Sequence, residues 1–160
     1  MKLNFLLIAF TFFCIVKTGA QTTSQFTPGE IWNDNKGIHI NAHGGGILYY
    51  NGLYYWYGEH KIASKIGNSA QVGVSCYSSK DLYNWKNESI ALTVDENPNS
   101  DITRGCVLER PKVIYNAKTK KFVMWFHLEL KDNGYYAARS GVAVSDNPTG
   151  PFTFLKSFRP

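Results

Sequence analysis

The stretch that decides the fold is NAHGGGILYYNGLYYWYGEH, residues 41–60. Within it, Asn51-Gly52 separates two runs of aromatic and aliphatic residues, which is the strongest short-range signal of a β-hairpin. We therefore expect strands over residues 46–50 and 53–57. The preceding glycines at 44–46 let the backbone approach another group closely, and Glu59 and His60 place ionisable side chains at the end of the hairpin.

The rest of the chain reads as further strands. A third strand is expected over residues 71–77 and a short outer strand over residues 82–89, followed by a polar linker at 95–104. The pattern then restarts with strands over residues 107–115, 121–127, 140–145 and 152–155. No apolar pattern of period 3.6 is long enough to predict a helix, so the fold class is all-β.

The two sets of four strands are offset by about 68 residues, a spacing that indicates an internal repeat. Tyr55 then aligns with Val123, and Trp85 lies close to Phe152. A repeat of four strands suggests blades of a β-propeller, although two halves of a β-sandwich are an alternative. Because propellers close with four to eight blades, we expect the front part of a longer protein, or else an oligomer of two-blade units.

The first 20 residues have the features of a secretory signal peptide. Lys2 precedes the apolar run of residues 5–16, and small residues end the segment at Ala20. The apolar run is about a dozen residues, which is short for a membrane span, so a retained anchor is the weaker alternative. We expect a mature chain of residues 21–160 that is secreted or periplasmic and not attached to a membrane.

The net charge bears on the class of binding partner, and the cysteine content bears on disulfide bonding. The formal net charge is +5 for the whole chain, and it falls to +3 without Lys2 and Lys17. The remaining basic residues are scattered, which argues against nucleic-acid binding. Cys76 and Cys106 remain after cleavage, and either a disulfide or two free buried thiols is compatible with export.

Glu59 is the first candidate site residue. It follows Trp56, and aromatic rings beside a carboxylate suit a sugar site, because rings stack on the apolar face of a sugar. A merely solvated glutamate at a strand end is the alternative. His43, before the three glycines, either contacts a ligand or belongs to an ordinary glycine-rich turn.

Glu109 and Arg110 are the second candidates, because they lie in an otherwise apolar strand. A charge at such a position needs a partner. The two residues form either a structural ion pair or a pocket carboxylate held by arginine. His127 recurs near the repeat position of Gly58, so it lines the same cavity or fills the core. No dense acidic cluster indicates calcium or another metal.

Five motifs that follow one another along the chain resemble glycoside hydrolase family 43, and most of all its subgroup of exo-β-1,3-galactanases and related β-galactosidases. The resemblance covers residues 29–160. The motifs are Asn41-Ala-His-Gly-Gly-Gly46, Tyr55-Trp-Tyr-Gly-Glu59, Ser78-Ser-Lys-Asp-Leu82 with Asn84-Trp85, Glu109-Arg-Pro-Lys-Val-Ile-Tyr-Asn116, and Ser145-Asp-Asn-Pro-Thr-Gly-Pro-Phe152.

This resemblance implies a five-bladed propeller, of which about the first two blades are present, that hydrolyses glycosidic bonds with inversion. It places Glu59 and Glu109 in the central pocket, with Glu109 as the catalytic candidate. His43 occupies the place of the aspartate base of most members, and in this subgroup a glutamine of a later blade is thought to replace that base. The general acid, expected in a Leu-Glu-Ala-Pro-like segment of the fourth blade, has no match in the 160 residues.

The function predicted from these observations is a secreted glycosidase acting on galactan or arabinogalactan side chains, with no cofactor. The substrate would be an oligosaccharide or polysaccharide, and the 160 residues alone would be inactive. A non-catalytic carbohydrate-binding module is the alternative, and the oligomeric state stays open. The residues predicted to contact substrate, besides Glu109, are His43, Glu59, Arg110, Trp56 and His127.

Overall fold

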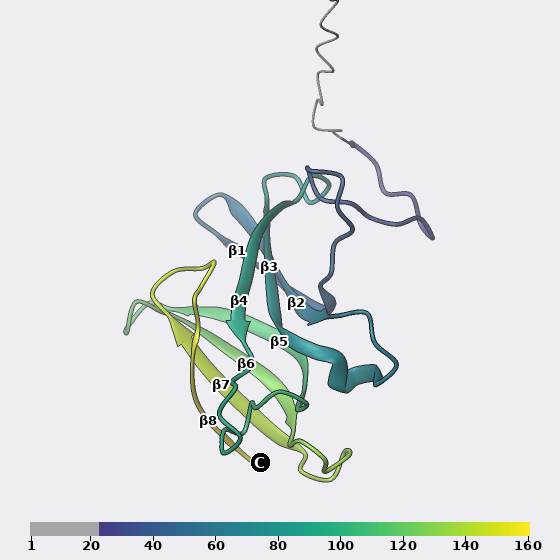
Figure 1. The fold of residues 1–160 in the computed structure, drawn as a ribbon. Helices are drawn as coiled ribbons and strands as arrows, with labels where there is room; N and C mark the ends of the chain where they lie inside the picture. The colour runs from purple at the N-terminus through teal and green to yellow at the C-terminus, as the bar shows by residue number, and fades with distance from the viewer. Residues whose placement is uncertain (1–22) are drawn as a thin grey trace, which may run out of the picture.

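A computed structural model describes residues 23–160, so the predicted signal peptide of residues 1–20 lies outside the described part. The first half forms a four-stranded antiparallel sheet in the order β1-β2-β3-β4 (Figure 1). Its strands are β1 His43–Tyr50, β2 Leu53–Lys61, β3 Gln71–Ser79 and β4 Lys86–Thr93, and a short 3-10 helix, η1 Gly67–Ala70, precedes β3.

The second half repeats this arrangement as a second antiparallel sheet in the order β5-β6-β7-β8. Its strands are β5 Val107–Asn116, β6 Lys121–Glu129, β7 Arg139–Ser145 and β8 Thr153–Phe158. No helix within residues 23–160 is long and apolar enough to cross a membrane.

The predicted all-β class and the two four-stranded units are confirmed. The predicted spacing also holds, because β6 begins 68 residues after β2 and β7 begins 68 residues after β3. The second and third strands of the two sheets therefore correspond residue by residue. This correspondence decides which side chains of the two sheets occupy equivalent positions.

The hairpin of β1 and β2 forms as predicted. Asn51 and Gly52 both have positive φ, 49° and 80°. This is the backbone that a two-residue type I′ turn requires, and asparagine and glycine adopt it at the least cost. Tyr50 then pairs with Leu53, and the register continues to Ile47 opposite Trp56.

The prediction for the outer strand of the first sheet was wrong at its start. Residues 80–85 form a turn, and β4 begins only at Lys86. The turn is held by Asp81, whose Oδ1 accepts hydrogen bonds from the amides of Tyr83 and Asn84. Trp85, which ends the turn, is buried.

One hydrophobic core fills the space between the two sheets. It contains Tyr57 and Cys76 from the first sheet and Leu108 and Met124 from the second, all fully buried. Cys76 and Cys106 are free thiols, which settles the question that the sequence left open. Burial raises the pKa of the Cys106 thiol to about 11, so it is protonated at neutral pH.

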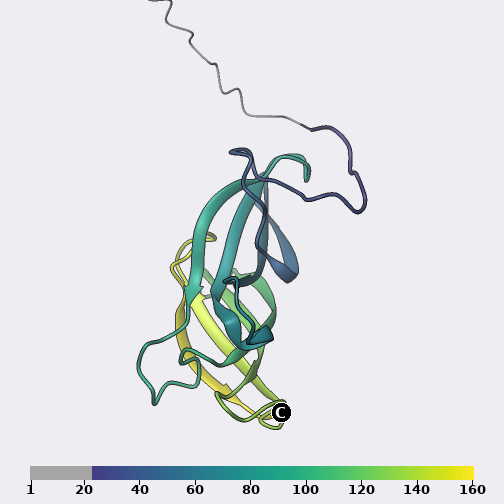
Figure 2. The same ribbon diagram turned by 45° about the vertical axis from the view of Figure 1, so that its right-hand side comes forward.

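A second cluster covers the other face of the first sheet. The segment before β1 passes along this face (Figure 2), and its Trp32 and Ile40 pack with Trp56 and Trp85. Because side chains alternate along a strand, Trp56 of β2 points into this cluster while Tyr55 and Tyr57 point toward the second sheet.

Candidate functional site

Matching β-bulges occur near the start of the first strand of each sheet. In β1 the register passes from His43 opposite Glu59 to Gly46 opposite Tyr57, so one extra residue lies in β1. In β5 it passes from Glu109 opposite His127 to Lys112 opposite Trp125 in the same way. Bulges bend a strand and change the direction of its side chains, and they are frequent beside active sites.

Each bulge therefore sits beside a cross-strand pair of one histidine and one glutamate. The order is reversed between the sheets, since β1 supplies the histidine and β5 supplies the glutamate. The residues that follow, Gly44 and Arg110, both have positive φ, 55° and 54°. Such a backbone is unusual for arginine and is typical of functional sites.

Glu59 is 5% exposed and is held from both sheets. Its Oε1 accepts a hydrogen bond from the backbone amide of Arg110 at 3.2 Å, and its Oε2 lies 3.0 Å from the ammonium group of Lys61. A Cβ atom on Gly44 would lie 2.6 Å from Oε1. The glycine at position 44 thus leaves the space that this carboxylate fills.

Glu109 is 8% exposed, and its partners also come from both sheets. Its Oε1 accepts hydrogen bonds from Asn68 Nδ2 at 3.0 Å and from the Tyr135 hydroxyl at 2.6 Å. Within residues 23–160, no ion pair joins Glu109 to Arg110, so the structural ion pair considered from the sequence does not form.

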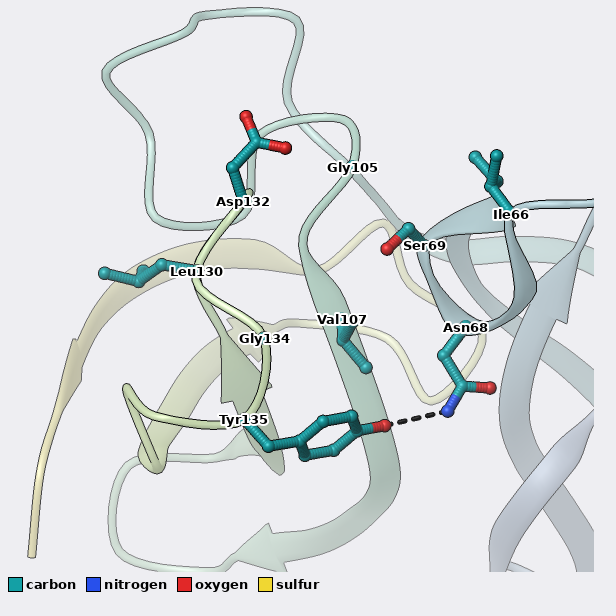
Figure 3. A pocket seen from close by; sticks show the side chains of 9 residues that line it. All are labelled: Ile66, Asn68, Ser69, Gly105, Val107, Leu130, Asp132, Gly134 and Tyr135. Carbon is teal, nitrogen blue, oxygen red and sulfur yellow. Dashed lines mark hydrogen bonds between the residues drawn. The ribbon is translucent and has the colours of Figure 1, made fainter.

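The two carboxylates belong to one hydrogen-bonded network. Lys61, which pairs with Glu59, also donates a hydrogen bond of 2.8 Å to Asn68 Oδ1, and Asn68 in turn donates to Glu109. Asn68 Nδ2 lies 2.7 Å from the Tyr135 hydroxyl as well (Figure 3). Because Tyr135 donates to the Glu109 carboxylate, the pKa of its phenol is raised, and partial burial raises it further.

His127 lies beside this network without bonding to it. Its ring stacks on that of Tyr135, with centroids 6.1 Å apart and planes 11° apart. Its Nε2 lies 2.9 Å from Oε1 of Glu129, which is 1% exposed and also accepts from the amide of Ala138. His127 therefore connects the aromatic ring of Tyr135 with a buried carboxylate.

His43 is the first residue of β1, and it lies close enough to His60, near the end of β2, to affect its titration. His43 is exposed, and His60 on β2 is 2.8 Å from the Ser75 hydroxyl through Nδ1. Burial lowers the pKa of His60, and His43 lowers it further. Both effects favour the neutral imidazole of His60 at neutral pH.

Arg110 and Trp56 occupy different surroundings from the two glutamates. The Arg110 side chain is exposed, and within residues 23–160 its guanidinium makes no hydrogen bond or ion pair, so it is available to an incoming group. Trp56 packs against Trp32 and Trp85, with ring centroids 5.5 and 5.3 Å apart. Its indole fits directly under Gly45. Contact of these residues with a substrate stays a prediction.

A pocket of about 320 Å³ opens beside the network, between η1, the start of β5 and the segment that follows β6 (Figure 3). The Asn68–Tyr135 hydrogen bond spans its edge. The wall is mixed in character, with Ile66, Val107 and Leu130 as apolar members and Ser69 and Asp132 as polar members. Within the described part of the chain, no three His, Cys, Asp or Glu side chains are arranged to hold a metal ion.

Sequence reasoning missed several residues of the site. Lys61 follows Glu59 by two positions, and this spacing could have indicated that both lie on one face of the strand. Asn68 and Tyr135 lie in connecting segments, where no periodic pattern places a side chain. Glu129 ends β6 two positions after His127, so the same spacing rule applied to it.

No protein-family model and no curated protein matches this chain. Among solved structures, a GH43 β-1,3-galactosidase with bound galactodeoxynojirimycin is 61% identical with a TM-score of 0.77, over 81% of this chain and 37% of that one. A second GH43 β-1,3-galactosidase is 50% identical with a TM-score of 0.78, over 88% and 29%.

An exo-β-1,3-galactanase from Phanerochaete chrysosporium, solved with galactose, is 41% identical with a TM-score of 0.76. The match covers 86% of this chain and 30% of that one. This chain thus spans only about a third of the length of the solved proteins that it matches.

Proposed function

Because this chain belongs to glycoside hydrolase family 43, in the group of β-1,3-galactosidases and exo-β-1,3-galactanases, we propose that it is part of a secreted glycosidase acting on galactan or arabinogalactan side chains. The observation that carries the proposal is the network joining Glu59 and Glu109 across the two sheets. Two nearly buried carboxylates beside an open pocket suit recognition of sugar hydroxyl groups, which donate hydrogen bonds to them.

Glu109 is proposed to contact the substrate directly. Its Oε1 already accepts two hydrogen bonds, whereas no group within residues 23–160 donates to its Oε2. That oxygen is available to a sugar hydroxyl group. His43, Glu59, Arg110, Trp56 and His127 are proposed as the surrounding substrate-binding residues.

The reaction is proposed to be hydrolysis with inversion. In such enzymes, an acid and a base lie about 6.5–9.5 Å apart, so that a water molecule fits between the base and the sugar. The family resemblance places the general acid in a fourth blade, and the two sheets account for only two blades, so we propose that the acid comes from sequence outside the 160 residues. On this proposal the 160-residue polypeptide by itself does not catalyse hydrolysis.

The proposed architecture is a five-bladed β-propeller in which the two sheets are the first two blades. The 68-residue spacing of corresponding strands and the shared core between the sheets support it. The chain covers only about a third of the length of its relatives, so a whole protein of their length could hold further blades.

The proposal is tested by release of galactose from β-1,3-galactan. The assay compares the longest protein encoded at this locus with the 160-residue form and with the Glu109→Gln variant of the long form. Glu96→Gln is the matched control, because it makes the same carboxylate-to-amide change at an exposed side chain. Activity of the long form and the control, with loss in Glu109→Gln and in the 160-residue form, would support the proposal.

A carbohydrate-binding module is the second candidate. The exposed rings of Tyr136 and of Tyr135, which bonds to Glu109, favour it, since such rings can stack on sugars without any catalysis. Binding of galactan by the long form, measured by calorimetry, with no release of galactose would select this candidate. If the long form showed no binding of galactan and no hydrolysis, both candidates would be contradicted.

A further inference from the structure

The Asn68 side chain bridges the two carboxylates, because it bonds both to Lys61, the partner of Glu59, and to Glu109. It lies in η1, in the connection between β2 and β3 of the first sheet. Its Oδ1 is 2.8 Å from Lys61 Nζ, and its Nδ2 is 3.0 Å from Glu109 Oε1 and 2.7 Å from the Tyr135 hydroxyl. Glu109 and Tyr135 lie 41 and 67 positions after Asn68 in the sequence.

The chemistry of the partners fixes the orientation of the Asn68 amide. A lysine ammonium group can only donate hydrogen bonds and an ionised carboxylate can only accept them. The amide oxygen must therefore face Lys61, and the amide nitrogen must face Glu109. Tyr135 has a single hydroxyl hydrogen, which it donates to Glu109, so its oxygen accepts from Asn68.

We propose that Asn68 is a positioning residue, which holds the Glu109 carboxylate so that its Oε2 faces the substrate. Two donors on the same oxygen, one from each sheet, restrict rotation of the carboxylate about its terminal bond. A reacting or binding group that is displaced by even about 1 Å can lose a hundredfold in rate. The inference rests on the proposed function, because it assigns Glu109 to the substrate.

Three substitutions separate the contributions of Asn68. Asn68→Asp keeps the shape and the contact with Lys61, but replaces the donor that faces Glu109 with a carboxylate oxygen. Asn68→Ala removes both contacts. Asn99→Ala is the matched control, because it makes the same change at an exposed side chain that lies outside the pocket and forms no side-chain hydrogen bond within residues 23–160.

The first measurement is the titration of the Tyr135 phenol by NMR in the 160-residue chain and its variants. The Asn68 hydrogen bond stabilises the phenolate and so lowers the pKa of Tyr135; its loss in Asn68→Ala should therefore raise that pKa. Asn68→Asp should raise it at least as much, since a second carboxylate then faces the phenol. Glu109→Gln should lower it, because the Glu109 carboxylate is the main cause of the raised value.

The second measurement is galactose release by the longest encoded protein. We expect kcat to fall by about 10- to 100-fold in Asn68→Asp and Asn68→Ala, with little change in KM, and Asn99→Ala to match wild type. A loss of stability alone would lower the amount of active protein without moving the Tyr135 titration. Circular dichroism of each variant reports on that loss.

Two results would overturn the inference: an unchanged Tyr135 titration in Asn68→Ala, or a wild-type kcat in both Asn68 variants. If the wild-type long form releases no galactose, the proposed function fails. The Tyr135 titration then still decides whether Asn68 holds Glu109, so the two failures can be told apart.

Discussion

Glu59 and Glu109 are each held by a residue of the other sheet. Glu59 of the first sheet accepts from the Arg110 amide of the second, and Glu109 of the second accepts from Asn68 of the first. Neither carboxylate can keep these partners unless the sheets are docked. The two glutamates are therefore sensitive to small displacements of single residues around them.

Gly44→Ala tests this sensitivity. The new Cβ would lie 2.6 Å from Glu59 Oε1, and φ at position 44 is +55°, so the side chain must move and the backbone is strained. We expect the free energy of unfolding to fall by about 1 kcal/mol from the backbone and by a further 1–2 kcal/mol from the displaced Glu59. Urea denaturation of the 160-residue chain measures the sum of these two losses.

Gly52→Ala is the control for this substitution. Gly52 also has positive φ, +80°, but nothing lies within 4 Å of its added Cβ. It should show the backbone cost without the clash. Equal destabilisation by the two substitutions would contradict the close packing of Gly44 against Glu59.

Among the elements, the turn at residues 80–85 is held by the Asp81 carboxylate together with the Ser79 hydroxyl, which accepts from the amides of Asp81 and Leu82. Asp81 accepts from the amides of Tyr83 and Asn84 through Oδ1 and from the Asn84 side chain through Oδ2. The hydrogen bonds from the Asn84 backbone and side chain are the main causes that lower the pKa of Asp81. The turn is thus stabilised by the charged form.

Acid should weaken this turn. Because the folded-state pKa of Asp81 lies below its ordinary value near 4, the stabilisation is fully present above about pH 4 and is lost as the pH falls through the lowered pKa. Asp81→Asn should therefore be less stable than wild type at pH 7, with a difference that narrows below pH 4. Thermal unfolding followed by circular dichroism at several pH values measures this difference.

Asp132→Asn serves as the comparison, since the Asp132 carboxylate accepts no hydrogen bond within residues 23–160 and lies in an exposed loop. Its stability should follow wild type across the pH range. A constant difference between Asp81→Asn and wild type from pH 7 to pH 2 would argue against the role of the Asp81 charge.

At the scale of the whole molecule, the two sheets share their core and several buried polar contacts. The Tyr57 hydroxyl donates to the Pro148 carbonyl at 2.7 Å, and Gln71 Oε1 accepts from the Leu108 amide at 3.0 Å. Gln71 is fully buried. We therefore expect the two sheets to unfold together, in one transition.

Gln71→Leu should destabilise both sheets at once. It leaves the buried amide of Leu108 without an acceptor, which costs about 1–3 kcal/mol. Hydrogen exchange measured by mass spectrometry should show faster exchange in β3 of the first sheet and in β5 and β6 of the second. Gln25→Leu makes the same change at an exposed side chain and should leave exchange unchanged. Faster exchange confined to the first sheet would contradict a single cooperative unit.

The sequence by itself determined the strands, the Asn51-Gly52 turn and the 68-residue repeat, because these follow from local patterns of aromatic, aliphatic and turn residues. It also singled out two candidate site residues, Glu59 as a carboxylate beside aromatic rings and Glu109 as a charge within an apolar strand. The start of β4 was misplaced, because the hydrogen bonds of Asp81 outweigh the strand preference of the aromatic residues that follow it.

Only the tertiary structure decided how the two glutamates are held. Asn68 and Tyr135 lie in connections that no periodic pattern orients, 41 and 26 residues away from Glu109, and docking of the sheets brings them to it. The tertiary structure likewise decided that Cys76 and Cys106 stay unpaired and that Glu109 bonds to an amide and a phenol and not to Arg110. Hydrogen bonds across such distances depend on the packing of whole sheets, which a local sequence pattern does not contain.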